Sequence, residues 1–420
     1  MWYNWVNMEE VFVEKFIPGG QALGTLADGR KIFFWNALPG ETVTEFEITK
    51  KKSHYVEAVA TAIKNPSPHR VEPKDECYLS TSPWQNMDFD YEMEQKAEIV
   101  KELFRENQIE IDVPEIKSDE KVFQYRNKME YALYYDLAEE KIKLAFHARG
   151  SHRKIPVSQS SIERPEIFNE AVKVVEDLNE RHEEARKYQS LLLRCDQNGN
   201  VSGGLFENGK PHPVFEKLKD KILGHEYSYS PNGFFQINLP VYELALSEMA
   251  KYIETESVLD LYSGVGTIGL SVARDKKLVL VECNGFAYSE LENNVISERS
   301  SLLSSQGSSL RPRSNCGCSL TTLFPNSEFP QAVHSNSEEA LEYIEPEQTV
   351  ILDPPRAGCD KKLIDKLLEV RPKKIIYLSC NPATQARDVK MLLEKYQIED
   401  VKTFNFFPRT PHIENLVILK

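Results

Sequence analysis

Cys380 occupies a position that a catalytic nucleophile would need. It follows the apolar run 375–378, which predicts a buried strand, and it is flanked by the polar residues Ser379 and Asn381. A single cysteine is more often a buried, inert side chain. At the carboxyl end of a strand in a parallel sheet, however, the thiol would face the ligand crevice, and this position favours a nucleophile.

Two carboxylates lie near apolar runs in the same part of the chain. Asp353 follows the run 349–352, and the two prolines after it fix the chain at the strand edge, so that Asp353 would face the ligand crevice. The plain alternative is a stiff turn before the next helix. Glu414 lies just ahead of a terminal strand at 416–419, where a single glutamate is usually solvated.

A glycine-rich turn lies between two predicted strands. Segment 260–269 reads D-L-Y-S-G-V-G-T-I-G, follows a β-like run and opens a helix, so its backbone could approach a nucleotide closely. It satisfies G-x-G-x-x-G, and Glu282 follows the next strand, 278–281, where an acid would bind ribose hydroxyls. On this pattern alone a nicotinamide dehydrogenase stays open. A purely structural turn is disfavoured, because strand, turn, helix, strand and acid occur in order.

The elements around these residues predict an α/β domain. Strands and helices alternate from residue 257 onward, which is typical of a doubly wound, mainly parallel sheet. Upstream, Phe234 and Phe235 read as core residues and Gln236 as the cap of a following helix. The Ser-rich segment 300–326 has no period and is expected to be loop or poorly ordered.

The N-terminal half predicts two further folding regions. Short strands with Gly/Pro punctuation indicate a small OB-like barrel in residues 1–65. A mixed α+β region follows. Its predicted elements are helices at 91–107 and 167–189, a β-hairpin from 125–137 and 141–147, and strands at 190–194 and 201–206.

Composition narrows the class of protein. The 420 residues predict two or three domains. The formal charge of −14 argues against nucleic-acid binding by overall charge, so a nucleic-acid partner must meet local basic patches, which occur at 50–52, 121–128 and 147–154. Each patch taken alone reads as a solvated face. No 18 apolar residues run together, and the start lacks a signal-like region, so we expect a soluble, cytoplasmic protein.

The cysteines do not indicate a disulfide framework. There are seven, an odd number, spread along the chain, so they are expected to be free thiols. Cys316 and Cys318 form one C-x-C pair with no second pair at metal-ligand spacing, so no metal site is expected.

Taken together, five segments resemble one family. They are F-F-Q-I-N (234–238), D-L-Y-S-G-V-G (260–266), D-P-P-R-A-G (353–358), S-C-N-P-A-T (379–384) and P-H-I-E (411–414). In this order they resemble the S-adenosylmethionine-dependent RNA uracil-5 methyltransferases, and the resemblance spans nearly the whole chain. The barrel, with G-G-Q-A-L-G at 19–24, resembles the TRAM domain of many members, and Y-R-N-K at 125–128 matches a central segment.

This resemblance implies a domain organisation and a chemistry. It implies a TRAM RNA-binding barrel at 1–65, a central α+β RNA-binding domain at 66–235 and a Rossmann-like methyltransferase domain at 236–420. Because uracil C5 is a poor nucleophile, a thiolate must first add to C6, which is the role implied for Cys380. Glu414 matches the family's base, which removes the C5 proton. Such a base contributes about 10²–10⁴ in rate.

The resemblance also implies a cofactor and a partner. S-adenosylmethionine is the implied methyl donor, and the positions that match the family's cofactor-binding residues are Gln236, Tyr262, Gly264, Thr267, Glu282, Asn336 and Asp353. The implied partner is an RNA loop from which the uridine is unstacked, at a cost of a few kcal/mol. Ribosomal RNA is favoured over transfer RNA, because the family's bacterial transfer-RNA branch usually lacks the barrel. We expect a monomer.

The chain departs from the family's pattern in two places. Many relatives bind a four-iron cluster through four cysteines, three of them closely spaced after the barrel; here only Cys77 remains, so no iron–sulfur cluster is expected. The Ser-rich segment 300–326 interrupts the region that leads to Asn336.

Three alternative functions stay open: a transfer-RNA uracil-5 methyltransferase, a non-catalytic RNA-binding relative and an NAD-dependent oxidoreductase.

Overall fold

The chain is built from two compact units, each assembled from three separate stretches. The computed structural model describes residues 6–7, 9–112, 116–158, 160–184, 187–212, 215–305 and 330–420. Unit 1 comprises 1–102, 118–216 and 405–413, and unit 2 comprises 103–117, 217–404 and 414–420. The structure therefore gathers the central region with the barrel, and the two units are described separately below.

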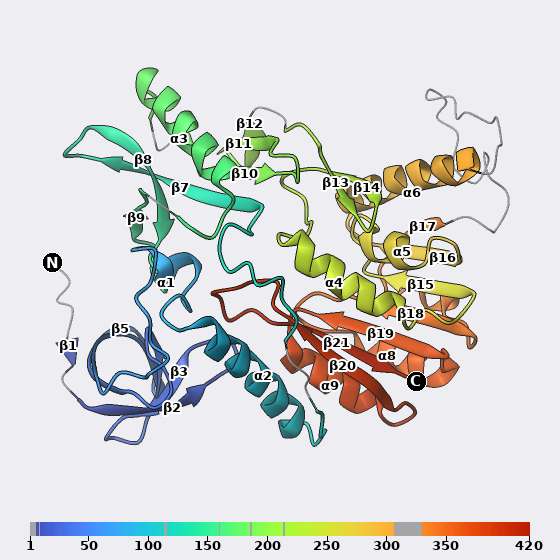
Figure 1. Cartoon of the computed structure of the whole chain (residues 1–420), viewed down its shortest axis with the longest axis horizontal. Coiled ribbons are helices and arrows are strands. Elements are labelled where there is room, and N and C mark those ends of the chain that lie inside the picture. The colour runs from blue at the N-terminus through green and yellow to red at the C-terminus, as the bar shows by residue number, and fades with distance from the viewer. Residues whose placement is uncertain are drawn as a thin grey trace. The chain divides into compact units, whose positions relative to one another are not determined.

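A closed barrel forms the N-terminal part of unit 1 (Figure 1). Its strands are β2 (Val11–Phe16), β3 (Ala22–Thr25), β4 (Lys31–Trp35), β5 (Thr42–Lys51) and β6 (Tyr55–Lys64), and β1 (Val6–Asn7) pairs with β5. The order β5-β2-β3-β4-β6 closes because β6 also pairs with β5. Alternate residues of β2 and β4 point into the core, as the alternating apolar pattern requires. The predicted OB-like barrel is confirmed.

The rest of unit 1 is a mixed α+β region around an antiparallel sheet of order β12-β11-β10-β7-β8-β9. Its elements are α1 (Tyr78–Thr81), α2 (Phe89–Glu106), β7 (Lys128–Asp136), β8 (Lys141–His147), β9 (Lys154–Pro156), α3 (Pro165–Glu180), β10 (Ser190–Cys195), β11 (Val201–Glu207) and β12 (Lys210–His212). The predicted hairpin and strands are confirmed. The helix predicted to reach residue 189 ends at Glu180 instead, because His182 takes a left-handed φ of 53° that an α-helix does not accommodate.

The segment 405–413 belongs to unit 1 through buried polar contacts with α2. The Glu92 carboxylate accepts hydrogen bonds from the Arg409 backbone N–H at 3.0 and 3.1 Å. Lys96 pairs with Glu92 at 2.9 Å and donates to Asn405 Oδ1 at 2.7 Å, with both charged side chains fully buried. Removing one partner of a buried pair leaves an uncompensated charge and costs about 3–5 kcal/mol.

Gly20 in the barrel lies against the same segment. Its φ of +89° favours glycine, and a Cβ there would stand 2.1 Å from the Pro411 side chain. The Gly20 carbonyl also accepts a hydrogen bond from Trp84 Nε1 at 3.0 Å. Gly20 is therefore explained by close packing as well as by its backbone conformation, and Gly19 by its left-handed φ of +93°.

Unit 2 is a seven-stranded sheet of order β17-β16-β15-β18-β19-β21-β20. Its elements are β13 (Leu218–Ile222), β14 (His225–Tyr229), α4 (Leu239–Ala250), β15 (Ser257–Leu261), α5 (Thr267–Val272), β16 (Lys277–Glu282), α6 (Gly285–Ser305), β17 (Gln331–His334), the 3₁₀ turn Leu341–Tyr343, β18 (Gln348–Leu352), α8 (Lys361–Val370), β19 (Lys374–Ser379), α9 (Pro382–Leu392), β20 (Ile398–Phe404) and β21 (Glu414–Leu419). The strands from β17 to β19 are parallel, and β21 is antiparallel to both of its neighbours. The predicted mainly parallel, doubly wound sheet is confirmed.

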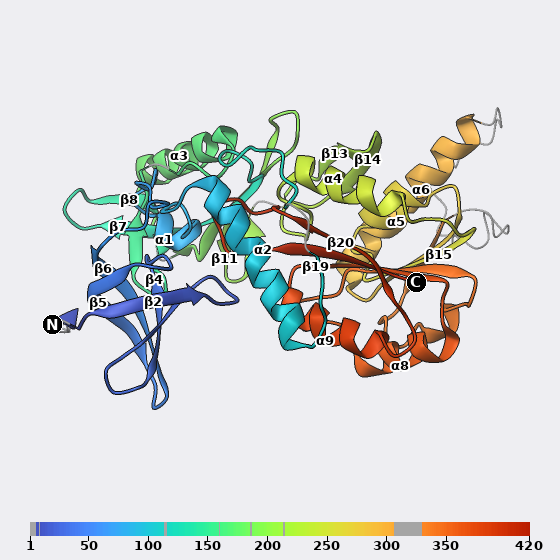
Figure 2. The same ribbon diagram turned by 60° about the horizontal axis from the view of Figure 1, so that its bottom comes forward.

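Helices cover both faces of this sheet. Figure 2 shows α8 and α9 on one face and α4 and α5 on the other. The central strands are accordingly buried along nearly their whole length, as parallel strands between two helical layers must be. The strand order reverses between β15 and β18, and ligands of such sheets bind at this point, beyond the carboxyl ends of the strands.

The Ser-rich segment is only partly described. Helix α6 continues to Ser305, so residues 300–305 of the segment predicted to be loop or poorly ordered are helical. The remainder of the segment, with Cys316 and Cys318, lies outside the described residues. In the part of the chain that the structure covers, no helix has the length and apolarity needed to cross a membrane.

Candidate active site

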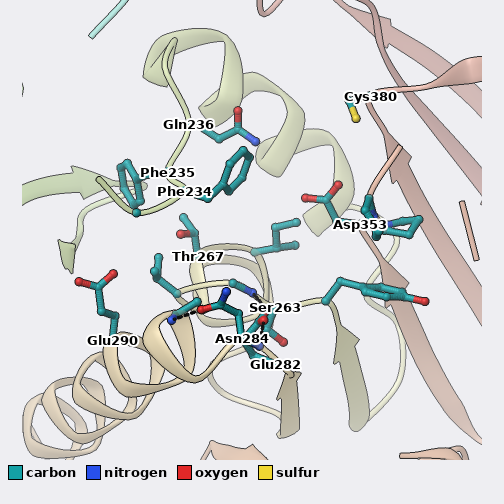
Figure 3. Close-up of a pocket in the computed structure, with 18 of the residues that line it drawn as sticks. Phe234, Phe235, Gln236, Ser263, Thr267, Glu282, Asn284, Glu290, Asp353 and Cys380 are labelled. Atoms are coloured by element: carbon teal, nitrogen blue, oxygen red, sulfur yellow. Dashed lines mark hydrogen bonds between the residues drawn. The ribbon is translucent and has the colours of Figure 1, made fainter. Parts of the chain in front are cut away.

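A cavity of about 620 Å³ opens within unit 2 at the carboxyl ends of the parallel strands. Its size is that of pockets that hold small molecules and cofactors. Residues at the ends of strands β15, β16, β18 and β19 and at the start of β21 line it, and the segment before α4 and helices α4, α5 and α6 supply the rest of the wall. Figure 3 shows Asp353 and Cys380 on one side of this cavity, with Glu282 and Asn284 on another.

The glycine-rich turn after β15 forms one wall. Tyr262 and Gly264 have left-handed φ values of 62° and 57°, which turn the chain sharply between β15 and α5. Gly269 packs against Asp260, where a Cβ would meet the carboxylate at 2.8 Å, and its N–H donates to Asp260 Oδ2 at 2.9 Å. Burial raises the pKa of Asp260 to about 8. The buried carboxyl group of Asp260 thus fixes the turn through its hydrogen bond with Gly269.

Glu282, at the end of β16, is fixed by backbone hydrogen bonds. Its Oε2 accepts from Gly264 N–H at 2.8 Å and its Oε1 from Asn284 N–H at 2.6 Å. The side chain is only 9% exposed. A carboxylate held in this way at a strand end keeps lone pairs for the hydroxyls of a bound ribose.

The thiol of Cys380 lies at the other end of the cavity. Burial, together with the carboxylates of Glu414 and Asp353, raises its pKa to about 11. Arg356 acts in the opposite direction through its charge and a side-chain hydrogen bond. A reactive thiolate at this position therefore depends on Arg356 or on positive charge from a ligand.

The peptide that carries Arg356 is attached to the start of α9. Asn381 Nδ2 and Thr384 Oγ1 both donate to the Arg356 carbonyl, at 2.8 and 3.1 Å. Asn381 also caps α9 by accepting from Ala383 N–H. Two segments far apart in the sequence, 353–358 and 379–384, are thereby locked together beside Cys380.

Glu414 is buried in the same cavity. It opens β21 and is 5% exposed, so the expectation of a solvated glutamate is wrong for this residue. Burial, together with the nearby charge of Asp353, raises its pKa well above the ordinary value, and Arg356 opposes this. A carboxyl group of raised pKa accepts a proton more readily than an ordinary one, which suits a general base.

The charged lining is strongly acidic. Among the described residues, four acids line the cavity against a single basic side chain: Glu282, Glu290, Asp353 and Glu414 against Arg356. Burial alone raises the pKa of Asp353 to about 7. Such a cavity favours a ligand that carries a positive charge, and it disfavours the pyrophosphate of a dinucleotide.

The structure brings together eight of the nine residues singled out from the sequence. Those that line the cavity are Gln236, Tyr262, Gly264, Thr267, Glu282, Asp353, Cys380 and Glu414. Asn336 is not among the lining residues; it is exposed and its Nδ2 donates to Glu339 at 3.3 Å. Arg356 also lines the cavity but had no role predicted from the sequence; its place directly after the two prolines of D-P-P-R-A-G was the available signal.

Other lining residues gave no clear sequence signal. Tyr242 lies on α4, and Phe286 and Glu290 lie on α6, where each reads as part of an ordinary helix face. Phe234, predicted to be core, is 75% exposed at the cavity, whereas Phe235 is buried against Tyr229 with ring centroids 3.9 Å apart. Only the three-dimensional packing separates these two neighbouring rings.

Comparisons with known proteins show which families and proteins this chain is similar to. Residues 335–420, which include Asp353, Cys380 and Glu414, match the family described as tRNA (Uracil-5-)-methyltransferase. An uncharacterized RNA methyltransferase of Bacillus cereus is 28% identical over 92% of this chain and 91% of its own length. Another, of Treponema denticola, is 28% identical over 99% of this chain and its full length.

A solved structure shares the fold. It is the Pyrococcus abyssi tRNA (uracil-54, C5)-methyltransferase in complex with S-adenosyl-L-homocysteine, with a TM-score of 0.72, 24% sequence identity and coverage of 98% of this chain and all of that one. The protein is an RNA methyltransferase. Residues 335–420 match the uracil-5-methyltransferase family, and the P. abyssi structure that shares the fold holds S-adenosyl-L-homocysteine.

Proposed function

We propose that this protein transfers a methyl group from S-adenosylmethionine to C5 of a uridine in RNA through a covalent bond between Cys380 and uracil C6. The observation that carries the proposal is the meeting of Cys380, Arg356, Asp353 and Glu414 in one acidic cavity with a glycine-rich turn. The donor supplies its methyl group on a positively charged sulfonium, the kind of charge that this cavity favours.

The chain's own residues would hold the cofactor as follows. Glu282 would accept hydrogen bonds from the two ribose hydroxyls, because its carboxylate is fixed at the strand end by Gly264 and Asn284. The backbone of the turn at Gly264 would approach the methionine part closely. Asp353 and Gln236 line the same cavity and would hold the polar groups at the reactive end.

The reaction requires a thiolate and then a base. Cys380 loses its proton and its Sγ forms a bond to uracil C6, which moves the electron pair of the C5–C6 double bond into an enolate. C5 would then form a carbon–carbon bond with the methyl group of the donor, while the carbon–sulfur bond of the sulfonium breaks and its electron pair stays on the sulfur. Glu414 removes the C5 proton, the double bond re-forms and the C6–Sγ bond breaks, so that Cys380 is released. Arg356 would stabilise the thiolate before attack.

Two RNA substrates stay open. The barrel, which resembles a TRAM domain, favoured ribosomal RNA. The P. abyssi enzyme, however, is a tRNA methyltransferase that matches 98% of this chain, a share that includes the barrel. The barrel therefore does not separate the two substrates, and transfer RNA is our second candidate.

Methyl transfer from labelled S-adenosylmethionine to unmodified total RNA tests this proposal. We expect 5-methyluridine in digests of the large ribosomal RNA; label in transfer RNA would keep the chemistry and correct the substrate. Cys380→Ala should abolish both label and covalent capture of RNA, while Cys77→Ala, outside the cavity, should leave both unchanged. Activity in Cys380→Ala would overturn the mechanism. Cofactor binding without any transfer would favour the non-catalytic alternative.

A further inference from the structure

One buried carboxylate of the cavity has an oxygen that no neighbouring residue uses. Glu290 lies on α6 and is 2% exposed. Its Oε1 accepts a hydrogen bond from Ser230 Oγ at 2.6 Å and lies 3.6 Å from Lys217 Nζ. In the described part of the chain, no residue donates a hydrogen bond to its Oε2. A buried acceptor without a donor costs free energy, which a bound donor would recover.

The surroundings of this oxygen leave room for a ligand. Glu290 lines the cavity together with Phe286, which lies one turn earlier on α6, and with Gly233 from the segment before α4. Gly233 has no side chain to cover the oxygen: a Cβ there would lie 3.4 Å from Glu290 Oε2 and 3.4 Å from the Phe286 ring. The open oxygen of Glu290 is therefore within reach of a molecule bound in the cavity.

Glu290 lies away from the reacting atoms of the proposed mechanism. Figure 3 shows it on the opposite side of the cavity from Cys380. The carboxyl groups that act on the thiol are those of Glu414 and Asp353. Glu282 is held at the end of β16 by backbone N–H groups and is assigned to the ribose. Glu290 is thus a buried acid of the cavity that neither the chemistry nor the ribose uses.

The chemistry of the donor indicates which of its groups Glu290 would hold. The sulfonium sulfur joins the methyl group, the ribose and the methionine chain. The methyl group has to face the Cys380 side and the ribose is assigned to Glu282, so the methionine chain is left for the remaining part of the cavity. That chain ends in an α-ammonium group, which offers only donors and a full positive charge. Hydrogen bonds between an ammonium and a carboxylate are about twice as strong as those of a neutral amine, such as that of adenine.

We propose that Glu290 Oε2 binds the α-ammonium group of S-adenosylmethionine. Ser230 and Lys217 hold the other oxygen, so that Oε2 stays directed into the cavity. Glu290 is accordingly a cofactor-binding residue, and Ser230 is a positioning residue that acts through it. The inference rests on the proposed function, because it names a further contact to the methyl donor of that reaction.

Calorimetry with the full chain and two probes tests this contact. The probes are S-adenosylhomocysteine and its analogue in which hydrogen replaces the α-amino group. We expect the wild type to bind the analogue about 10- to 100-fold more weakly, as for the loss of a charge-assisted hydrogen bond. Glu290→Gln should weaken S-adenosylhomocysteine by about the same factor and leave the Kd of the analogue within about twofold, because the analogue never made the contact.

The second probe and a matched variant separate binding from folding. Glu292, also on α6, is half-buried and is not among the described residues that line the cavity, so Glu292→Gln should bind both probes like the wild type. Equal Kd values of the wild type for the two probes, an unchanged Kd of Glu290→Gln for S-adenosylhomocysteine, or equal losses of both probes in Glu290→Gln would each overturn the inference.

Activity distinguishes the inference from the function on which it rests. Wild-type protein that separates the two probes as expected but transfers no methyl group to RNA would refute only the proposed function. Wild-type protein that binds neither probe would overturn both. Methyl transfer by the wild type together with equal binding of the two probes would overturn the contact at Glu290 and leave the proposed function in place.

Discussion

Iodoacetamide should alkylate Cys380 slowly at neutral pH and increasingly fast in base. The thiolate is the reactive form, and burial together with Glu414 and Asp353 raises the pKa of this thiol to about 11. At pH 7 such a thiol is ionised in about one molecule in ten thousand, against about one in thirty for an ordinary thiol of pKa about 8.5. We therefore expect alkylation about 300-fold slower than that of a free cysteine peptide, and a rate that still rises about tenfold per pH unit at pH 9.

Two variants should move this rate in opposite directions. Arg356→Gln removes the nearby positive charge, so the pKa of Cys380 should rise and the alkylation rate at pH 8 should fall about three- to tenfold. This is a small effect for a neighbouring charge, because Arg356 is exposed and water screens it. Arg356→Lys should keep part of the rate. Glu414→Gln removes a carboxylate that raises the pKa, so alkylation should become faster.

Mass spectrometry of the peptide that contains Cys380, after timed alkylation of the folded protein, gives these rates without interference from the other cysteines. The reasoning is refuted if the rate levels off near pH 8, or if Arg356→Gln and Glu414→Gln change it in the same direction. Circular dichroism of each variant serves as the control for folding.

Three further results are expected. Glu414→Gln should accumulate a protein–RNA adduct that survives a denaturing gel, because the C5 proton stays in place and Cys380 cannot leave; normal turnover without an adduct would remove Glu414 from the mechanism. Glu282→Ala should weaken the binding of S-adenosylhomocysteine, measured by calorimetry, about tenfold or more, because hydrogen bonds to a charged group contribute about 1.5–3 kcal/mol each. Asn336→Ala, outside the cavity, should bind normally. Equal losses in both variants would contradict the assignment of Glu282 to the ribose. The raised pKa of Asp260 means that its contribution to the stability of the fold is complete below about pH 4 and is lost as the pH rises through about 8. In Asp260→Asn, the free energy of unfolding measured by urea titration should therefore fall less between these pH values than in the wild type. An unchanged slope would show that another group is responsible.

Much of the fold could be predicted because its periodic signals are local. The buried strands β15, β18 and β19 appear in the sequence as short apolar runs followed by turn residues, and α2 appears as a helical repeat. The end of α3 was missed because a non-glycine residue, His182, takes the left-handed conformation there. The membership of segment 405–413 in unit 1 was also missed, since it depends on contacts between residues about three hundred positions apart in the chain.

The site was predictable to the extent that its residues follow strands. Asp353, Cys380 and Glu282 stand at strand ends, so the topology of a parallel sheet already brings them to one edge. The burial of Glu414 could not be read from a turn-like sequence. Nor could the opposing effects of Arg356 and Glu414 on Cys380, because these depend on side-chain distances that no local pattern encodes.

Because the two units are interleaved along the chain, truncated fragments cannot be used to assign functions to one unit or the other. The chain passes from one unit to the other at five places, namely 102/103, 117/118, 216/217, 404/405 and 413/414. A fragment that ends at residue 216 would lack segment 405–413 and so expose the buried charges of Glu92 and Lys96. A fragment that starts at residue 217 would lack segment 103–117, whose Lys117 N–H donates to the Thr403 carbonyl at 2.9 Å. Deletion mapping should therefore yield insoluble halves, and RNA binding and methyl transfer are separable in this protein only by point substitutions.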